Sequence, residues 1–178
     1  MIFFTSDLHF GSQNIITYCE RPFKDVNHQT ERLIKAINMR CKEDDVLYHI
    51  GDFVMYGRER GVEVNRIKPA EYEKRINCQI IHILGNHDLN NGVRGGITGC
   101  YIKFGKQTAW LQHTPPWDKS CIAPTDADIY LCGHVHKSWK IRTYCEKPVI
   151  NVGCDVWDYK PIKVQDIIKF IQKQEKVK

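Results

Sequence analysis

Long apolar runs are missing from this sequence of 178 residues. No stretch approaches the roughly 20 apolar residues that a helix needs to cross a membrane. The opening run Ile2-Phe3-Phe4-Thr5 is typical of a short strand and not of a signal-peptide core. Internal repeats, low-complexity segments and linkers are also absent. We therefore expect no membrane partner and a single domain over residues 1–178, a length that can bury a substantial hydrophobic core.

Closely spaced cysteines are absent too, although the chain has eight cysteines. They stand at positions 19, 41, 78, 100, 121, 132, 145 and 154, so no Cys-x-x-Cys pair is present. This excludes the usual spacings of zinc ribbons and thioredoxin-like proteins. We expect the thiols to be reduced and the protein to be cytoplasmic, because disulfides are rare in that compartment.

No long stripe of one charge is found in the sequence. The formal net charge is +5 and the sequence pI is about 8.7, which favours anionic partners. Lysine and arginine are spread widely, with local clusters only at residues 58–75 and in the tail. A nucleic-acid binder more typically gathers its basic residues on one face, so nucleic acid is not indicated as a partner.

Strand-like runs alternate with helical patterns in the first half of the chain. Leu33, Ile34 and Ile37 recur at helical spacing behind a candidate cap, Asn27, and Pro69 suits the first turn of a second helix reaching about residue 77. A last helix is predicted around residues 164–171, and residues 53–69 are predicted to form a loop. The strands are expected at residues 2–6, 46–50, 79–84, 100–104, 108–112, 128–132, 139–144 and 149–152. This order predicts an α/β domain.

Metal-binding side chains follow five of these expected strands. They are Asp7, Asp52, Asn86, His113 and His134. Sites in α/β sheets gather at the carboxyl ends of strands, so five separate segments can deliver these side chains to one place.

The spacing within the motifs adds further candidates. Residues 7–9 (Asp-Leu-His) and 134–136 (His-Val-His) each place two donors at i and i+2, which point to the same side of an extended backbone. The same relation holds within residues 86–88 (Asn-His-Asp), whose central histidine faces elsewhere. Seven candidate ligands suit two divalent ions that share a bridging carboxylate. Nitrogen and oxygen donors without thiolate favour Mn²⁺, with Fe, Ni or Zn as alternatives, over Ca²⁺ or Mg²⁺.

The strings DLH, GD, GNHD and GHVH, with the lone His113 between the last two, resemble the signature of the calcineurin-like metallophosphoesterases, in the same order. The resemblance spans residues 5–136, and the tail NVGCDVWDYKPI is similar to that of small bacterial and phage members. It implies two packed mixed β-sheets flanked by α-helices, arranged as a four-layer sandwich.

The resemblance also implies a role for each motif residue. Asp52 would bridge the two metal ions, His87 would lie by the phosphate and protonate the leaving oxygen or stabilise the transition state, and Asp88 would orient His87. Ser12 stands where many small relatives have histidine, which puts a substrate contact in question but not metal binding. Asp7, His9 and His136 would hold the first ion, and Asn86, His113 and His134 the second.

The implied reaction is the hydrolysis of phosphomonoesters or phosphodiesters, with a nucleotide among the candidate substrates. A hydroxide shared by two metal ions would attack phosphorus in line, assisted by His87. Two alternatives stay open: a catalytically silent binding scaffold of the same fold, and a small nuclease. A scaffold typically lacks His87 or a metal ligand, and nucleases usually carry added capping segments or partner domains.

Other polar residues have weaker assignments. Arg58 and Arg94 lie in loops after motif strands, where they would either meet the substrate phosphate or form solvated loop charges. His28, His49 and His82 fall outside the motifs and are predicted to be structural. The four tryptophans are predicted to pack in the core and at its rim. Substrate choice would depend on the loops at 53–69 and 90–99.

Overall fold

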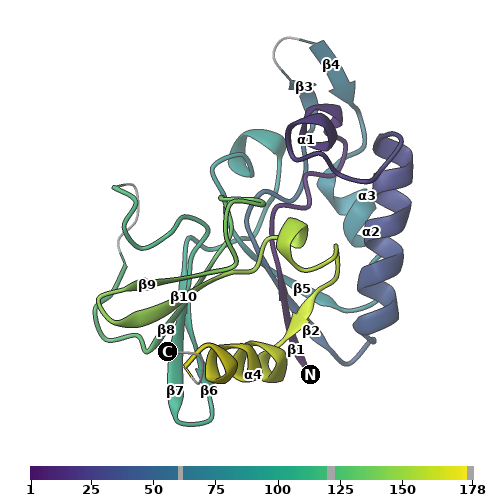
Figure 1. Cartoon of the computed structure of the whole chain (residues 1–178). Helices are drawn as coiled ribbons and strands as arrows, with labels where there is room; N and C mark the ends of the chain where they lie inside the picture. Colours follow the sequence, from purple (N-terminus) through teal and green to yellow (C-terminus); the bar gives the residue numbers. More distant parts are fainter. Residues whose placement is uncertain (60–61, 120–122, 176–178) are drawn as a thin grey trace.

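Two larger β-sheets, a two-stranded hairpin and four α-helices make up the parts of the chain that the computed structural model describes, residues 1–59, 62–119 and 123–175. In Figure 1, α2 and α3 lie on the outer side of the first sheet, and α4 lies across the end where the two sheets approach each other. The hairpin projects from the opposite end, beside α1. This arrangement confirms the expected α/β fold with two mixed sheets and helices.

The first sheet holds three parallel strands, β1 (Ile2–Thr5), β2 (Val46–Ile50) and β5 (Gln79–Ile83), in the order β11-β1-β2-β5. Its fourth strand, β11 (Ile162–Lys163), pairs antiparallel with β1 and returns from the C-terminal part of the chain. Parallel neighbours require crossover connections, which the segments containing α2 and α3 supply.

The second sheet has the strand order β6-β7-β8-β10-β9. Its central pairs β7–β8 and β8–β10 are parallel, and the outer pairs β6–β7 and β9–β10 are antiparallel. The strands are β6 (Cys100–Phe104), β7 (Gln107–Leu111), β8 (Ile129–Cys132), β9 (Ile141–Tyr144) and β10 (Lys147–Asn151). Each lies within two residues of its predicted bounds, because β-favouring runs here end at turn residues.

Alternating side chains divide the apolar residues between separate cores. On β1, Phe3 packs toward α2, whereas Phe4 packs between the two sheets. On β8, Leu131 joins the core between the sheets, and Tyr130 joins a third cluster on the far face of the second sheet. This is the period-two alternation of a strand covered on both faces, and it fixes which polar residues reach the strand ends.

The helices differ from expectation in their boundaries. The cap of helix α2 (Val26–Arg40) lies two residues earlier than predicted, because Asp25 and not Asn27 accepts a hydrogen bond from a first-turn amide, the backbone N–H of His28, at 2.7 Å. The short helix α1 (Gln13–Tyr18) was not expected, and the Ser12 hydroxyl caps it by accepting from Ile15 N–H. The predicted helix after Pro69 is confirmed but shorter, and the last one extends further. Their bounds are α3 (Pro69–Glu73) and α4 (Val164–Glu175).

The predicted loop at residues 53–69 is wrong in part, because β3 (Gly57–Glu59) and β4 (Val62–Asn65) pair as an antiparallel hairpin there. Strands of three and four residues are too short to produce a readable alternation. The Asn65 amide donates to the carbonyls of Met55 and Ile67, which anchors the base of the hairpin. Two 3-10 helices complete the secondary structure, Leu89–Asn91 and Cys154–Val156.

Within the described ranges, no helix combines the length and apolar character that a membrane span requires. The seven cysteines that the structure describes form no disulfide with one another, and Cys121 lies outside the described residues.

Candidate metal centre

The turns that follow the motif strands are hydrogen-bonded to each other. The backbone N–H of Asp7 donates to Gly51 carbonyl oxygen at 2.9 Å, and that of His9 donates to the Asp52 carbonyl at 3.0 Å. From the second sheet, the backbone N–H of His134 donates to both oxygens of the Asp7 carboxylate, at 3.0 and 3.1 Å. These bonds bring segments from residue 7 to residue 134 to one place, where the sequence predicted a single site.

The donor atoms of the candidate ligands form two groups. Within each group, the atoms lie within 4.8 Å of one another. The rings of His113 and His134 lie edge to face, and those of His9 and His136 are stacked, both with centroids 5.2 Å apart. We call Asp7, His9 and His136 the first group, and His113 and His134, together with Asn86, the second group; the Asp52 carboxylate, which lies within the same distance of His113 and His134, is described separately.

Asn86 belongs to the second group by its contacts. Its side-chain oxygen lies 3.2 Å from Nε2 of His113 and 3.0 Å from Nδ1 of His134. The oxygen of an amide is the ligand atom expected beside two imidazole nitrogens at a site for Mn, Fe, Ni or Zn.

Asp52 lies between the two groups. Its Oδ2 is 3.6 Å from His9 Nε2 on one side and 3.3 Å from His113 Nε2 on the other. Its Oδ1 accepts a hydrogen bond from the backbone N–H of His87 at 3.1 Å. Although burial raises the pKa of this carboxyl, its hydrogen bond with His113 and the charges of His113 and His9 outweigh burial and hold the pKa below the ordinary value. Asp52 is therefore ionised and positioned between both sets of nitrogen donors.

Left-handed backbone conformations bring the motif side chains together. Asp7, His9, Asp52, His134 and His136 have φ values of 57°, 46°, 60°, 70° and 46°. Extended backbone was expected for the i and i+2 pairs, and that expectation is wrong. Such φ values are uncommon outside glycine and are typical of strained functional segments. The pairs converge because tight turns, and not pleated strands, aim them.

Two glycines make room for this close approach. Gly51 has φ of +85°, and a Cβ atom there would lie 2.1 Å from His113 Nδ1. At Gly85, a Cβ would lie 2.3 Å from Asp52 Oδ1. Both contacts are shorter than atoms allow, so a side chain at either position would displace a candidate ligand.

The hydrogen bonding of His113 selects the nitrogen that faces the site. Its Nδ1 lies 2.8 Å from the Ile50 carbonyl, which can only accept, so Nδ1 carries a proton and Nε2, beside Asp52, is the nitrogen available to a metal ion. Burial lowers the pKa of His113, but its hydrogen bond with Asp52 and the charges of Asp7 and Asp52 raise it to about 9. Without a metal ion, this imidazole is a cation near neutral pH.

His9 shows the opposite electrostatic behaviour. Burial lowers its pKa to about 3, so the ring is neutral. Its Nε2 is buried and has no hydrogen-bond partner among the described residues. An orphaned, neutral and buried imidazole nitrogen is costly in an apolar environment and is what a metal ligand requires. The donor set and this unpaired nitrogen both fit a divalent metal ion.

His87 and Asp88 occupy different environments. His87 is exposed, and its ring centroid is 5.8 Å from that of His9. Asp88 is fully buried, and its carboxylate accepts from the backbone N–H groups of Asp52, Phe53 and Gly85 at 2.7–2.8 Å. We expected Asp88 to orient His87 directly, but these three hydrogen bonds go to other backbone groups. Asp88 instead joins the two turns that carry Asp52 and Asn86.

Of the two predicted substrate arginines, Arg94 does not join this constellation. It lines a separate hollow of about 330 Å³ with Glu73 and His82. Arg58 lies on β3, and its side chain is outside the described residues. His49 and His82 are buried, as expected of structural residues, although both ring nitrogens of His49 lack a hydrogen-bond partner among the described residues.

A cleft of about 810 Å³ opens beside the first group. His9, His87 and His136 form one part of its lining, and the rest comes mainly from α1, from the segment before β3 and from the turn after β5. The lining outside the histidines is Ser12, Asn14, Ile15, Thr17, Tyr18, Met55, Tyr56, Asn90 and Asn91. Ser12 therefore both caps α1 and faces this cleft, where relatives with histidine would place an imidazole.

Two buried residues near the first group were missed by the sequence analysis. Arg21 and Asp155 form an ion pair at 2.8 Å, with side chains 0% and 2% exposed. Asp155 lies within the tail segment that resembles the family, which was a signal that it has a role. Arg21 lies in no motif, and its contacts come from residues distant in the sequence.

Several known proteins are similar to this chain in sequence or in fold. The model of the calcineurin-like phosphoesterase family matches residues 1–123. The uncharacterized protein MJ1445 of Methanocaldococcus jannaschii is 32% identical over 182 residues, which cover 99% of this chain and 94% of that protein. AQ665 from Aquifex aeolicus, a crystal structure of a protein of unknown function, has a TM-score of 0.70 and 25% identity, covering 96% of this chain and 98% of that chain.

The fold is also that of an enzyme whose activity is stated. Yfce, a phosphoesterase from E. coli, has a TM-score of 0.51 and 19% identity, covering 84% of this chain and 77% of that chain. At this identity the likeness concerns the fold alone. The family match over residues 1–123 and the relative that aligns along nearly the whole chain are sufficient for an assignment. The chain belongs to the calcineurin-like phosphoesterase family.

Proposed function

We propose that this protein is a dinuclear metal-dependent hydrolase of phosphomonoesters or phosphodiesters. The observation that supports this most strongly is the place of Asp52, whose Oδ2 lies 3.6 Å from a nitrogen of the first group and 3.3 Å from a nitrogen of the second. A carboxylate between two sets of metal-ligating side chains is the arrangement that two divalent ions require if they share one bridging ligand.

Each ion would have its own protein ligands. Asp7, His9 and His136 would hold the first, and Asn86, His113 and His134 the second, with Asp52 common to both. When bound, two such ions supply Lewis acidity toward the phosphoryl oxygens and lower the pKa of a water molecule toward neutrality. We favour Mn²⁺, with Fe, Ni and Zn as alternatives, because the donors are imidazole, carboxylate and amide.

His87 would act on the substrate and not on the metals. It is exposed, lies in the lining of the cleft, and has its backbone N–H fixed by Asp52 Oδ1 at 3.1 Å. From this position, an imidazole can protonate the leaving oxygen or neutralise charge on the phosphoryl group in the transition state. Its anchoring by Asp52 couples the position of this acid to that of the bridging carboxylate.

The cleft would hold the alcohol part of the ester. Its named lining combines the amides of Asn14, Asn90 and Asn91 with the rings of Tyr18 and Tyr56. Amides and aromatic rings recognise groups that are planar, hydrogen-bonding and uncharged, so a nucleotide is a suitable candidate.

Two other functions are weaker fits. A catalytically silent scaffold would be expected to have lost a ligand or His87, and all are present. A small nuclease would bind DNA with strong dependence on salt, and the lysines and arginines of the sequence are spread widely instead of forming a long basic stripe.

A substrate panel tests the proposal. An aryl phosphomonoester, an aryl phosphodiester and cyclic nucleotides would be assayed with Mn²⁺, Ni²⁺ and Mg²⁺, before and after chelation. We expect metal-dependent turnover of at least one of these substrates, lost on chelation and restored by Mn²⁺. Metal binding without turnover of any phosphoester would favour the scaffold.

A further inference from the structure

The buried pair Arg21–Asp155 lies directly behind the first group. Asp155 binds the guanidinium with both oxygens, accepting from Nε at 2.8 Å and from Nη2 at 2.9 Å. Burying two charges is costly unless they are paired and every donor is satisfied. The other contacts of the two side chains must therefore account for their burial.

Arg21 uses its remaining donors on the DLH segment. Nη2 donates to the Asp7 carbonyl at 2.7 Å, and Nη1 donates to the Leu8 carbonyl and to Gln29 Oε1, both at 3.1 Å. Gln29 in turn donates to the His9 carbonyl at 3.3 Å. The five N–H groups of the guanidinium thus have five acceptors, and the carbonyls of residues 7–9 are held from one direction. This is the segment whose backbone adopts left-handed φ values.

Asp155 contacts the third member of the first group. Its Oδ2 lies 3.5 Å from Nδ1 of His136, which is buried and has no hydrogen-bond partner at ordinary distance among the described residues. A carboxylate beside one nitrogen of an imidazole fixes the ring and leaves the other nitrogen for a metal ion. Asp155 therefore lies beside Nδ1 of His136, just as the Ile50 carbonyl lies beside Nδ1 of His113 in the second group.

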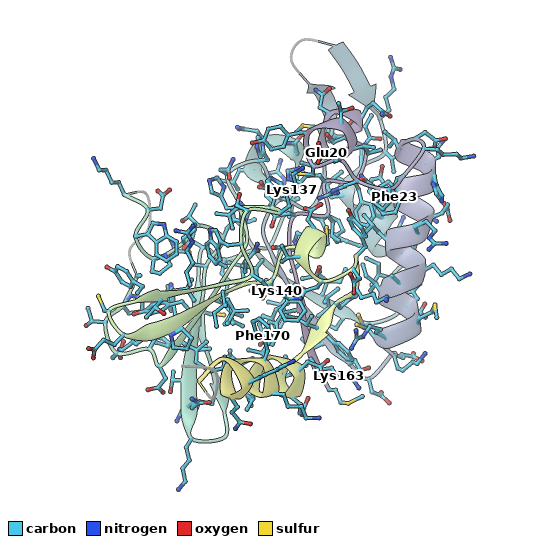
Figure 2. All side chains as sticks on the ribbon, viewed as in Figure 1. Glu20, Phe23, Lys137, Lys140, Lys163 and Phe170 are labelled. Atoms are coloured by element: carbon cyan, nitrogen blue, oxygen red, sulfur yellow. The ribbon has the colours of Figure 1, made fainter. Side chains whose placement is uncertain are left out.

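The neighbouring surface pair has a different character. Lys137 and Glu20 lie next to each other in Figure 2 and form an exposed ion pair, adjacent in sequence to His136 and Arg21. Exposed pairs contribute little because water screens them. The two pairs share the segment of Glu20 and Arg21, but only the buried pair contacts residues of the first group.

We propose that the Arg21–Asp155 pair positions the first metal site. Arg21 fixes the backbone of Asp7 and His9, and Asp155 fixes the ring of His136, so that ligands from distant parts of the chain form one set. Both are positioning residues and not ligands, and the inference rests on the proposed dinuclear site.

Mn²⁺ titration by calorimetry tests this inference without measuring activity. Asp155→Asn keeps the shape and one acceptor for Arg21 but removes the charge that faces His136. We expect Asp155→Asn and Arg21→Lys to weaken one of the two Mn²⁺ equivalents by about 10–100-fold and to leave the other unchanged. Glu20→Gln, which removes the exposed pair, is the matched control and should bind both equivalents as the wild type does.

A double-mutant comparison identifies which site is affected. In a His113→Ala background, only the first group is complete, so adding Asp155→Asn should weaken the remaining Mn²⁺ binding by the same factor. In a His9→Ala background, adding Asp155→Asn should change nothing further. Ile167→Ala, a cavity in the remote α4 core, controls for general destabilisation and should not alter Mn²⁺ affinity.

The outcomes separate the two proposals. If the wild type binds none of Mn²⁺, Fe²⁺, Ni²⁺ and Zn²⁺, the proposed function fails. If the wild type binds two equivalents and folded Asp155→Asn binds both with unchanged affinity, only the positioning role is overturned. Should Asp155→Asn not fold, Asp155→Glu moves the carboxylate by one methylene, and unchanged affinity in that variant overturns the role equally.

Discussion

The two ligand groups are supported in different ways, although their ligands are similar. The second group is held mainly by hydrogen bonds among the motif segments themselves: the Asp88 carboxylate fixes the turns of Asp52 and Asn86, and the Ile50 carbonyl fixes His113. The first group is held by a buried ion pair whose members, Arg21 and Asp155, are separated by 134 positions. One half of the site is therefore supported from within the motif segments, and the other depends on the C-terminal segment returning to the first strand.

This difference has a functional consequence. The cleft includes His9 and His136 of the first group in its lining, together with His87, and the named lining contains no member of the second group. The half of the site that would meet the substrate group is the half whose geometry depends on long-range contacts. Substitutions that act on one ligand group, on both or on neither can test this difference between the two groups.

The largest effect is expected where the two groups meet. Asp52→Asn removes the charge shared by both groups, so turnover should fall at least roughly 1000-fold. The assay is hydrolysis of an aryl phosphate with Mn²⁺, accompanied by the thermal melt. Asp166→Asn, which removes a partly exposed carboxylate on α4, is the control and should keep full turnover. Full turnover of Asp52→Asn would show that the bridging assignment is wrong.

His87 belongs to neither group, so its replacement should separate chemistry from metal binding. His87→Asn is expected to lower kcat by roughly 100-fold, because a proton donor in the transition state contributes about that much. Mn²⁺ affinity should stay at the wild-type value. Loss of Mn²⁺ binding in this variant would mean that His87 supports a ligand and does not act on the substrate.

Asp88→Asn tests the support that the Asp88 carboxylate gives to the turns of Asp52 and Asn86. The amide retains one acceptor oxygen but turns its NH₂ toward backbone N–H donors, so we expect a loss of about 3 kcal/mol in the free energy of unfolding. Urea denaturation measures this loss. Asp128→Asn, at an exposed carboxylate that accepts from the Thr108 N–H, should cost much less. Equal costs would argue against a special role for Asp88 in joining the turns.

Each group contains one histidine whose pKa is raised when no metal is bound. Burial opposes the shift in both, but Asp52 and Asp7 raise the pKa of His113 to about 9, and Asp155 with Cys19 raises that of His136 to about 10. An unfolded histidine titrates near 6.5, so this stabilisation is complete below about pH 6.5 and is lost as pH rises through the folded values. The Tm of the chelated protein should fall between pH 7 and 10.

The thermal melt of chelated protein at several pH values measures this dependence, and His113→Gln should make it shallower. A Tm that rises over the same range would contradict the protonation of the metal-free site. Because metal ligands must be deprotonated, Mn²⁺ binding should release protons at pH 7, which calorimetry in buffers of different ionisation enthalpy detects.

The smallest effect is expected in the cleft outside both groups. Tyr18 is largely exposed at the edge of α1 and lines the cleft. Tyr18→Ala should raise KM for a nucleotide by roughly 3–10-fold through lost ring contact, with little change in kcat. Tyr101→Ala, at another exposed tyrosine on β6, is the matched control. An unchanged KM in Tyr18→Ala would place the substrate group elsewhere.

The sequence was sufficient to predict that Asp52 and the second group follow strands and lie together. Asp52, Asn86 and His113 each follow a strand that the apolar pattern marks clearly, and their supports come from the same motifs. The strands of both sheets were predicted to within two residues, with the exception of the two-residue strand β11, which was not predicted. Strands of four or five residues are readable because their β-favouring runs end at turn residues.

The supports of the first group and the short elements could not be predicted in this way. Arg21 and Asp155 meet only after β11 and the preceding segment return to β1, and no periodicity records that contact. Helix α1 has six residues and depends on the Ser12 cap, and the strands of the hairpin have three and four. The left-handed φ values at Asp7 and His9 reflect tertiary hydrogen bonds and not the preference of aspartate or histidine.

The central claim is that two ligand groups on either side of Asp52 form one dinuclear hydrolytic site. Its most direct test is turnover of an aryl phosphate measured against the number of Mn²⁺ ions bound per chain, starting from chelated protein. We expect binding to reach about two equivalents and turnover to follow the second equivalent. Saturation at one equivalent with full turnover, or full turnover by the chelated protein, would contradict the account.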